Sequence, residues 1–309
     1  MKRLVNTFTV LLLLFSGSMA TSAQDNLKTK YAPTPKDLEE LSEKLIELES
    51  NEISTINDIK DYVKQVENFA QEYYHGDKSS MSKDFVADLA IRADLAIRDI
   101  KKYAEEKANG STRDMMECGI LNTAIFHYNT GLNSKKLCGQ IDLPVVGAVI
   151  DEIEAWQKLE NTLCDYYAYC GFMENQGGSM ANLVATGSAW RLAEARYYDT
   201  KMLLKAGFAR GSRGFYKIDD IKKNANETVN NLTSKAKDLL NCDDDFKASP
   251  YYKEVSKGLT EAYENLKTDM DAWIKARLSL VSCLEEQFIG INETQKVLNK
   301  INEIGTSEQ

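Results

Sequence analysis

The sequence predicts an all-α protein, an antiparallel bundle of about eight or nine helices. Its 309 residues include only four prolines, and long stretches are rich in Leu, Ile, Ala, Lys and Glu, which favour helices. Apolar residues recur at spacings of three and four, whereas the alternation typical of half-buried strands is almost absent. Since this spacing places apolar side chains on one face of each helix, we expect the helices to pack by those faces.

Residues 1–23 have the pattern of an export signal peptide. Lys2 and Arg3 precede the apolar stretch 8–15, and small residues lead up to Ala23. We expect cleavage after Ala23 and a periplasmic or secreted protein without a membrane span. The alternative, a membrane anchor that is retained, is disfavoured because the apolar stretch is too short to cross a bilayer.

The mature chain is predicted to be strongly acidic. Loss of Lys2 and Arg3 with the signal lowers the basic residues from 38 to 36 against 47 acidic ones, a net charge of −11. This charge argues against nucleic acid and anionic membrane surfaces as partners. It suits a cationic protein partner, although acidic charge can also serve only to keep an exported protein soluble.

The region from residue 24 to 110 is predicted to form an N-terminal helical section without cysteine. Thr34 and Pro35 suit the N-cap and first turn of its first helix, and a long helix is expected over 81–107. The sequence Asn-Gly-Ser at 109–111 then either separates two domains or forms an ordinary turn between helices.

Residues 111–309 are predicted to form a cysteine-containing helical bundle. A loop is expected over 129–144, where Gly131, Gly139 and Pro144 interrupt the helical pattern. Helices are expected at about 112–128, 145–170, 180–208, 217–241, 250–285 and 287–304. The tripeptides 154–156 (Glu-Ala-Trp) and 271–273 (Asp-Ala-Trp) resemble each other. They mark either a degenerate duplication or a chance similarity between two amphipathic helices.

Six cysteines follow the signal, and an even number in an exported chain favours disulfide bonds. A metal site is the weaker alternative, because there is no C-x-x-C pair and His75 and His127 are the only histidines. If successive helices alternate in direction, certain cysteines fall at the same level of the bundle. The disulfides predicted on this basis are Cys118–Cys164, Cys170–Cys242 and Cys138–Cys283.

No residue pattern points to catalysis. His75 and His127 have no nucleophile motif beside them, and acidic runs such as 243–245 are typical of solvated helix ends. We therefore expect no catalytic residue, no metal and no cofactor.

Two glycine-containing segments are of interest for other reasons. Gly177 and Gly178 are expected to let the chain reverse, and Ser179 to cap the following helix. The stretch with Arg210, Arg213 and Phe215 is a locally basic loop in an acidic protein. It is either a candidate binding loop or a plain linker between helices.

Trp156, Cys164, the Gly-Gly-Ser turn at 177–179 and Arg196 occur in the order seen in LprI-like lysozyme inhibitors, a family that the chain resembles over about 45 residues. Glu160 departs from the family pattern, which usually has Arg there. A looser match has Arg277 after Trp273 but places Cys283 two residues late. The resemblance implies an exported, disulfide-bonded helical protein that inhibits lysozyme, a cationic enzyme.

Three functions follow from these observations. The first is a non-enzymatic binding protein that inhibits lysozyme or another cell-wall hydrolase. The second is an extracytoplasmic hydrolase that acts on glycans through surface carboxylates, and the third is a helical adaptor protein of the envelope. A cleft with paired, pKa-shifted carboxylates would favour the hydrolase.

Overall fold

The structure is a computed structural model that describes residues 97–140, 143–207, 217–241, 247–248 and 251–306. Within these ranges the regular structure is helical and contains no strand, which confirms the all-α prediction. The signal peptide and most of the N-terminal section lie outside the described residues. After a helix over 97–107 come α6 (Thr112–Gln140), α7 (Leu143–Glu174), α8 (Ser179–Ala206), α9 (Ile218–Leu240), α11 (Tyr252–Val281) and α12 (Gln287–Thr306).

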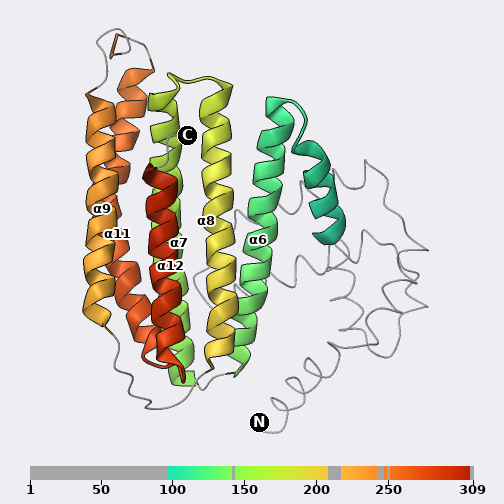
Figure 1. The fold of residues 1–309 in the computed structure, drawn as a ribbon, viewed down its shortest axis with the longest axis vertical. Coiled ribbons are helices and arrows are strands. Elements are labelled where there is room, and N and C mark those ends of the chain that lie inside the picture. The colour runs from blue at the N-terminus through green and yellow to red at the C-terminus, as the bar shows by residue number, and fades with distance from the viewer. Residues whose placement is uncertain (1–96, 141–142, 208–216, 242–246, 249–250, 307–309) are drawn as a thin grey trace, which may run out of the picture.

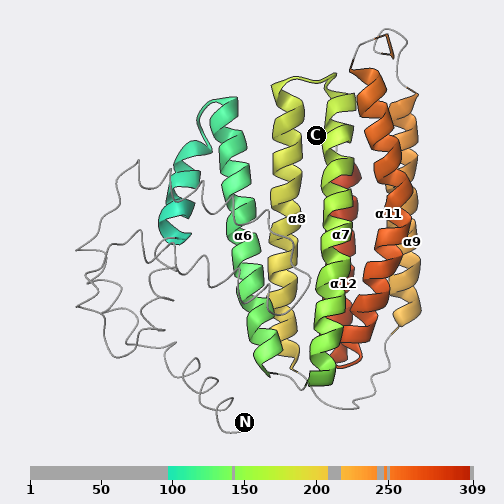
Figure 2. The same ribbon diagram turned by 180° about the vertical axis from the view of Figure 1, so that it is seen from behind.

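The long helices run nearly side by side (Figures 1 and 2). α7 packs most extensively against α11, and α8 lies between α7 and α6. Gly119 lies against Thr186, and further along both helices Asn133 contacts Thr200, so α6 and α8 run in the same direction. Helices that follow one another along the chain run antiparallel (Figure 1). α6 and α8, which pack against each other at one side of the bundle, run parallel.

Aromatic side chains fill much of the core between α7, α9, α11 and α12. Tyr166 and Tyr167 are fully enclosed there, and each places its hydroxyl where a helix carbonyl can accept a hydrogen bond. Tyr166 donates to the carbonyl of Leu232 on α9 at 2.8 Å, and Tyr167 donates to that of Ile301 on α12 at 3.0 Å. Because a buried hydroxyl without a partner is costly, these bonds fix how α7 faces its two neighbours.

The turn expected at 109–111 is present between the helix 97–107 and α6. Ser111 caps α6 reciprocally with Asp114, since the Ser111 backbone N–H donates to the Asp114 carboxylate and the Asp114 N–H approaches the Ser111 hydroxyl. Lys107 reaches across the turn to Asp114 and Glu117, at 3.3 and 3.0 Å. These contacts hold the two helices together at this point.

The prediction of a loop over 129–144 is wrong, because α6 continues without interruption to Gln140. Gly131, Asn133, Leu137 and Cys138 are all buried on this continuation. A glycine inside a helix costs only about 1 kcal/mol, and the burial of apolar side chains on the roughly three additional turns outweighs it. α7 begins close behind at Leu143.

No helix among the described residues combines the length and the apolarity that crossing a bilayer requires.

Candidate functional site

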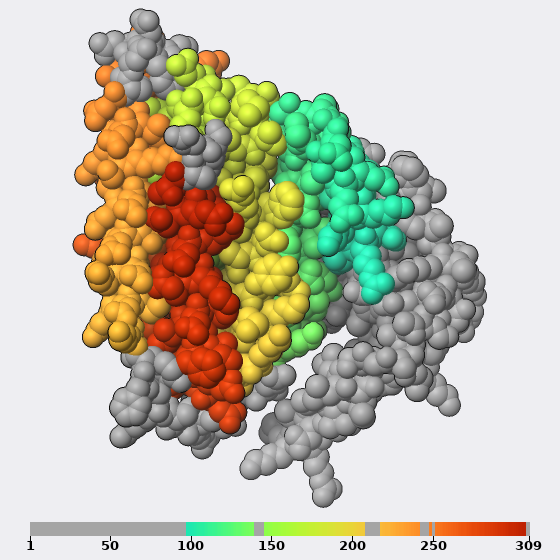
Figure 3. All heavy atoms as spheres, in the orientation of Figure 1, coloured from blue at the N-terminus to red at the C-terminus, as the bar shows by residue number. Residues whose placement is uncertain are grey.

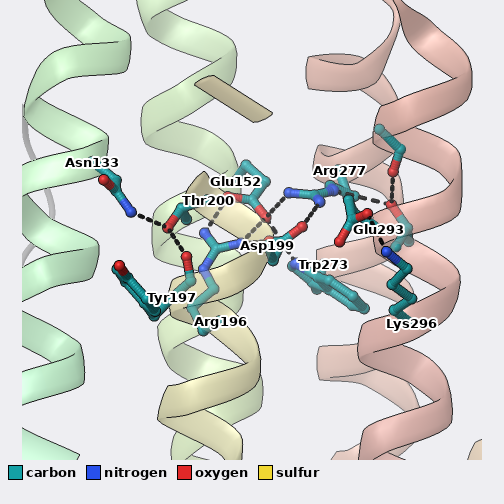
Figure 4. A network of polar contacts seen from close by, with 12 residues as sticks. Asn133, Glu152, Arg196, Tyr197, Asp199, Thr200, Trp273, Arg277, Glu293 and Lys296 are labelled. Carbon is teal, nitrogen blue, oxygen red and sulfur yellow. Dashed lines mark hydrogen bonds and ion pairs between the residues drawn. The ribbon is translucent and has the colours of Figure 1, made fainter. Parts of the chain in front are cut away.

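The most distinctive group in the structure is a set of charged side chains buried in the middle of the bundle, which we call the central charge network (Figure 4). It consists of Glu152 on α7, Arg196 and Asp199 on α8, and Arg277 on α11, each at most 2% exposed. Charged side chains are almost never enclosed to this degree unless they are paired. The network is therefore the first place to look for a function.

Each charge in the network faces an opposite charge. Arg196 forms a two-pronged pair with Glu152, whose Oε1 lies 2.8 Å from Nη1, and it also donates to Asp199 at 2.8 Å. Arg277 bridges the same two carboxylates from the other side and donates through Nε to the Thr294 hydroxyl at 3.0 Å. Two guanidinium groups and two carboxylates thus join α7, α8, α11 and α12 with no net charge.

Two tryptophans enclose this network. Trp273, on α11, donates its indole N–H to Glu152 at 2.9 Å. Trp156 meets Trp273 edge to face at 5.2 Å between ring centroids, and the Arg196 guanidinium lies 5.0 Å from the Trp156 ring. The rings exclude water and give Arg196 a cation–π contact. Both tryptophans are buried and belong to the hydrophobic core.

The electrostatics of the network favour the charged forms of Glu152 and Arg196. Burial alone would raise the pKa of Glu152, but Arg196 and Arg277 hold it below its ordinary value. Burial likewise would lower the pKa of Arg196, yet Glu152 and Asp199 raise it. A carboxylate that stays ionised in this way has no proton to donate as a general acid near neutral pH.

A further carboxylate, that of Glu160, extends the polar layer toward α6, and its side chain is 12% exposed. It accepts the indole N–H of Trp156 at 2.7 Å and pairs with Nε2 of His127 at 3.0 Å. Burial opposes its ionisation, but the attraction and hydrogen bonds of His127 and Trp156 lower the pKa of Glu160. Glu160 thus links α7 to α6 through His127.

The role that this arrangement of paired charges supports is to hold helices together. Removing any one member would leave a buried charge without compensation, so the network holds four helices in a single register. Among the described residues, no group of three or more His, Cys, Asp or Glu side chains could hold a metal ion. A shallow surface depression between α9 and α11, lined by residues such as Leu240, Tyr252 and Lys257, lies apart from the network.

The five cysteines in the described ranges form no disulfide with one another. The Cys118–Cys164 prediction assumed that α6 and α7 pack along their length, whereas α6 packs mainly on α8 and meets α7 through contacts such as His127–Glu160, and the two cysteines are not bonded to each other. The Cys138–Cys283 prediction placed both cysteines at one end of the bundle, and Cys138 does pack with Val281 and Leu284, which are near Cys283 in the sequence. The Cys283 thiol, however, is directed at the Ser279 carbonyl on its own helix.

Cys242 lies outside the described residues, so Cys170–Cys242 stays a prediction. Cys170 is near the C-terminal end of α7, and the ion pair of Glu174 with Lys235 places this end beside the last turns of α9. Cys242 follows α9 by two residues. The described part of α9 therefore ends at the same end of the bundle as Cys170.

The Gly-Gly-Ser segment forms the expected reversal between α7 and α8. Gly177 and Gly178 both have φ of 86°, a conformation that favours glycine. Ser179 does not cap α8, because the N-cap position falls on Gly178 and Ser179 is the first helical residue, with no side-chain capping bond. Arg210, Arg213 and Phe215, the candidate binding loop, lie outside the described residues, as does His75.

Sequence reasoning singled out Arg196 and Arg277 through the resemblance but missed Glu152 and Asp199. One signal for Asp199 was available, since it stands three residues after Arg196 and hence on the same helical face. Glu152 offered no comparable signal, because it lies among other acidic residues, Asp151 and Glu154, and only burial distinguishes it.

No protein-family model matches the chain, and no curated protein or solved structure matches it either.

Proposed function

We propose that the chain is an exported, non-enzymatic binding protein, with a cationic cell-wall hydrolase such as lysozyme as the partner to test first. The proposal combines the signal-like residues 1–23, the acidic mature chain and the resemblance to LprI-like inhibitors. The observation that carries it is the central charge network, where Arg196 and Arg277 fully engage Glu152 and Asp199.

This observation favours a scaffold over a glycan hydrolase. A retaining or inverting glycosidase needs two carboxyl groups that flank a substrate, one of them with a raised pKa. Glu152 and Glu160 instead have lowered pKa values and are occupied by Arg, His and Trp partners inside the bundle. Such groups contribute rigidity, which a binding surface benefits from because less freedom is lost on association.

The distribution of charge suggests where a cationic partner would be attracted. The described residues contain 26 acidic and 25 basic side chains, so the bundle is almost neutral. Residues 24–96 contain 16 acidic and nine basic side chains, a net charge of −7 out of the −11 of the mature chain. We therefore expect the N-terminal section, more than the bundle, to steer the encounter with a cationic enzyme.

The experiment is an assay of lysozyme activity on cell-wall substrate, with and without the purified mature protein, at low and moderate salt. Inhibition at near-stoichiometric protein that weakens as salt rises supports the proposal, since salt screens the attraction. Absence of inhibition at large excess removes lysozyme as the partner. Release of sugars from the substrate by the protein alone would favour the hydrolase.

Disulfide bonding of Cys170 with Cys242 is part of the same proposal. An oxidising compartment would allow this bond, which would tie the end of α7 to the segment after α9 and stabilise the fold by about 2–4 kcal/mol. Peptide mapping of the exported protein without reductant tests it. Recovery of Cys170 as a free thiol peptide from fully folded protein would exclude the bond.

A further inference from the structure

The surface of α8 that faces away from the core has an unusual charge for this protein. We call it the α8 outward face, and its residues recur at helical spacing on one side of the helix: Met180, Gly187, Arg191, Glu194, Tyr198, Lys201 and Lys205. The three charged residues of α8 that are exposed, Arg191, Lys201 and Lys205, are all basic. On the adjacent α7, by contrast, the exposed charged residues include Asp151, Asp165 and Glu174, with one lysine, Lys158.

None of the three cations on this face has an ion-pair partner in the described part of the chain. Some exposed lysines elsewhere in the bundle pair along their helix, as Lys223 does with Glu227 and Lys257 with Glu261, whereas others, such as Lys267 on α11, are also without an ion pair in the described residues. Lys201 contacts only the neighbouring Tyr197, donating to its hydroxyl at 3.3 Å and lying 5.3 Å from its ring. Glu194 is the one acidic residue of the α8 outward face, so the face as defined has a net charge of +2.

The same face carries an exposed aromatic ring and open space. Tyr198 and Met180 are each 52% exposed, among the most exposed large apolar side chains of the bundle. A Cβ added at Gly187 would have no heavy atom within 4 Å, so the face is not covered there. Figure 3 shows α8 surface, in yellow, open between α12 and the helix 97–107.

We propose that the α8 outward face binds an acidic polysaccharide. Arg191 and Lys201 are ten residues apart, about 15 Å along the helix, and Lys205 lies about 6 Å further, so the cations form a row that a repeating polyanion can follow. Tyr198 sits within this row and offers an aromatic face against which the C–H groups of a sugar ring can pack, with a hydroxyl for hydrogen bonding. The export predicted from the sequence would bring the chain into contact with such polymers.

Two other polyanions fit the face less well. The net charge of −11 of the mature chain opposes every polyanion, and it opposes nucleic acid most strongly because a DNA duplex carries one negative charge per about 1.7 Å of its axis. An acidic peptide would find the cations but would gain little from the exposed Tyr198 ring, since peptide recognition on helical surfaces generally uses an apolar groove. The combination of spaced cations with one exposed ring is typical of sugar recognition.

The test is a titration of the full mature protein with polygalacturonate at low salt, in parallel with polyglutamate and with uncharged dextran. The first variant carries Arg191→Gln, Lys201→Gln and Lys205→Gln, and the second carries Tyr198→Ala. The matched control has the same charge change on exposed lysines of α11, Lys253→Gln, Lys267→Gln and Lys275→Gln. All the substituted side chains lie on the surface or half-exposed, so circular dichroism should show the same helical content in each variant.

The expected result is that polygalacturonate binds and dextran and polyglutamate bind at least tenfold more weakly. The α8 triple variant should bind roughly tenfold more weakly than the wild type, the contribution expected from three exposed ion pairs, and the α11 control should bind as the wild type does. Tyr198→Ala should also weaken the binding. Three outcomes would overturn the proposal: no binding of polygalacturonate, equal losses in the α8 and α11 variants, or equal binding of polyglutamate with no effect of Tyr198→Ala. This titration is independent of the lysozyme assay, so either proposal can fail alone.

Discussion

Trp156 and Trp273 meet edge to face at the centre of the bundle, with their ring centroids 5.2 Å apart. The two residues end the tripeptides 154–156 and 271–273, whose similarity is visible in the sequence. α7 and α11 thus use equivalent positions of similar segments to contact each other. This arrangement is what a duplication would produce, although two unrelated amphipathic helices packed antiparallel can also meet at their largest residues.

The first prediction concerns this aromatic pair. Trp156→Phe and Trp273→Phe should each destabilise the protein, and the double variant should lose less than the sum of the two. We expect a coupling free energy of about 0.5–1.5 kcal/mol, the usual range for buried aromatic pairs. Urea unfolding of the four proteins measures it. Additive losses would mean that the rings contribute only by filling volume.

The second prediction concerns Arg277, which is fully enclosed. Arg277→Met should lower the free energy of unfolding by about 3–5 kcal/mol, because Glu152 and Asp199 then lose a buried counter-charge. Adding Asp199→Asn should recover part of this loss, since it removes the one negative charge that the remaining Arg196 does not balance. The control is Lys275→Met, an exposed position on the same helix, where we expect a change within about 0.5 kcal/mol.

A double variant less stable than Arg277→Met alone would contradict this account. It would mean that Asp199 is held mainly by Arg196, with which it also pairs, and not by the balance of the whole network.

The third prediction concerns the two kinds of helical glycine in the bundle. A Cβ at Gly258 on α11 would overlap the ring of Tyr169 on α7, whereas a Cβ at Gly147 would meet nothing within 4 Å. Gly258→Ala should therefore destabilise by about 1–3 kcal/mol through overpacking. Gly147→Ala, in the interior of α7, should stabilise by about 0.5–1 kcal/mol through helix propensity. Thermal unfolding of both variants checks the opposite signs, and a shift of the same sign in both would contradict the packing argument.

The sequence predicted the fold class and most helix positions, because helix caps and apolar spacing are local properties. α8, α9 and α12 begin and end within about two residues of their expected ranges. The prediction failed at Gly131, where a local helix breaker was outweighed by the burial of Leu137 and Cys138 further along. Burial depends on neighbours that are distant in the sequence, and no local pattern reports it.

The candidate site was less predictable for a related reason. Which helices become neighbours is a tertiary property, and the assumption that α6 packs along the length of α7 led directly to the wrong Cys118–Cys164 pair. In the same way, Glu152 becomes a buried counter-ion only because α8 and α11 bring Arg196 and Arg277 to it from 44 and 125 residues away. The sequence shows the residue types, but it does not show that these side chains contact one another in the folded protein.

The last prediction concerns the stability of the protein at acidic pH. The pKa values of Glu152 and Glu160 are lower in the folded protein than the ordinary value of 4.5. A carboxyl group with a lowered folded-state pKa adds stability above its unfolded pKa, and this contribution is lost as the pH falls from about 4.5 through the folded-state pKa. We therefore expect the free energy of unfolding of the wild type to decrease steeply below about pH 5.

Glu160→Gln isolates one of the two carboxylates, because glutamine can still accept the Trp156 indole N–H but brings no negative charge to His127. The variant should be about 1–3 kcal/mol less stable than the wild type at pH 6, and the difference should shrink as the pH falls from about 4.5 through the lowered pKa of Glu160. Urea unfolding at several pH values measures both curves, with Glu261→Gln, an exposed carboxylate on α11, as the control. Curves for Glu160→Gln and the wild type that stay parallel down to pH 3 would show that ionised Glu160 does not stabilise the bundle.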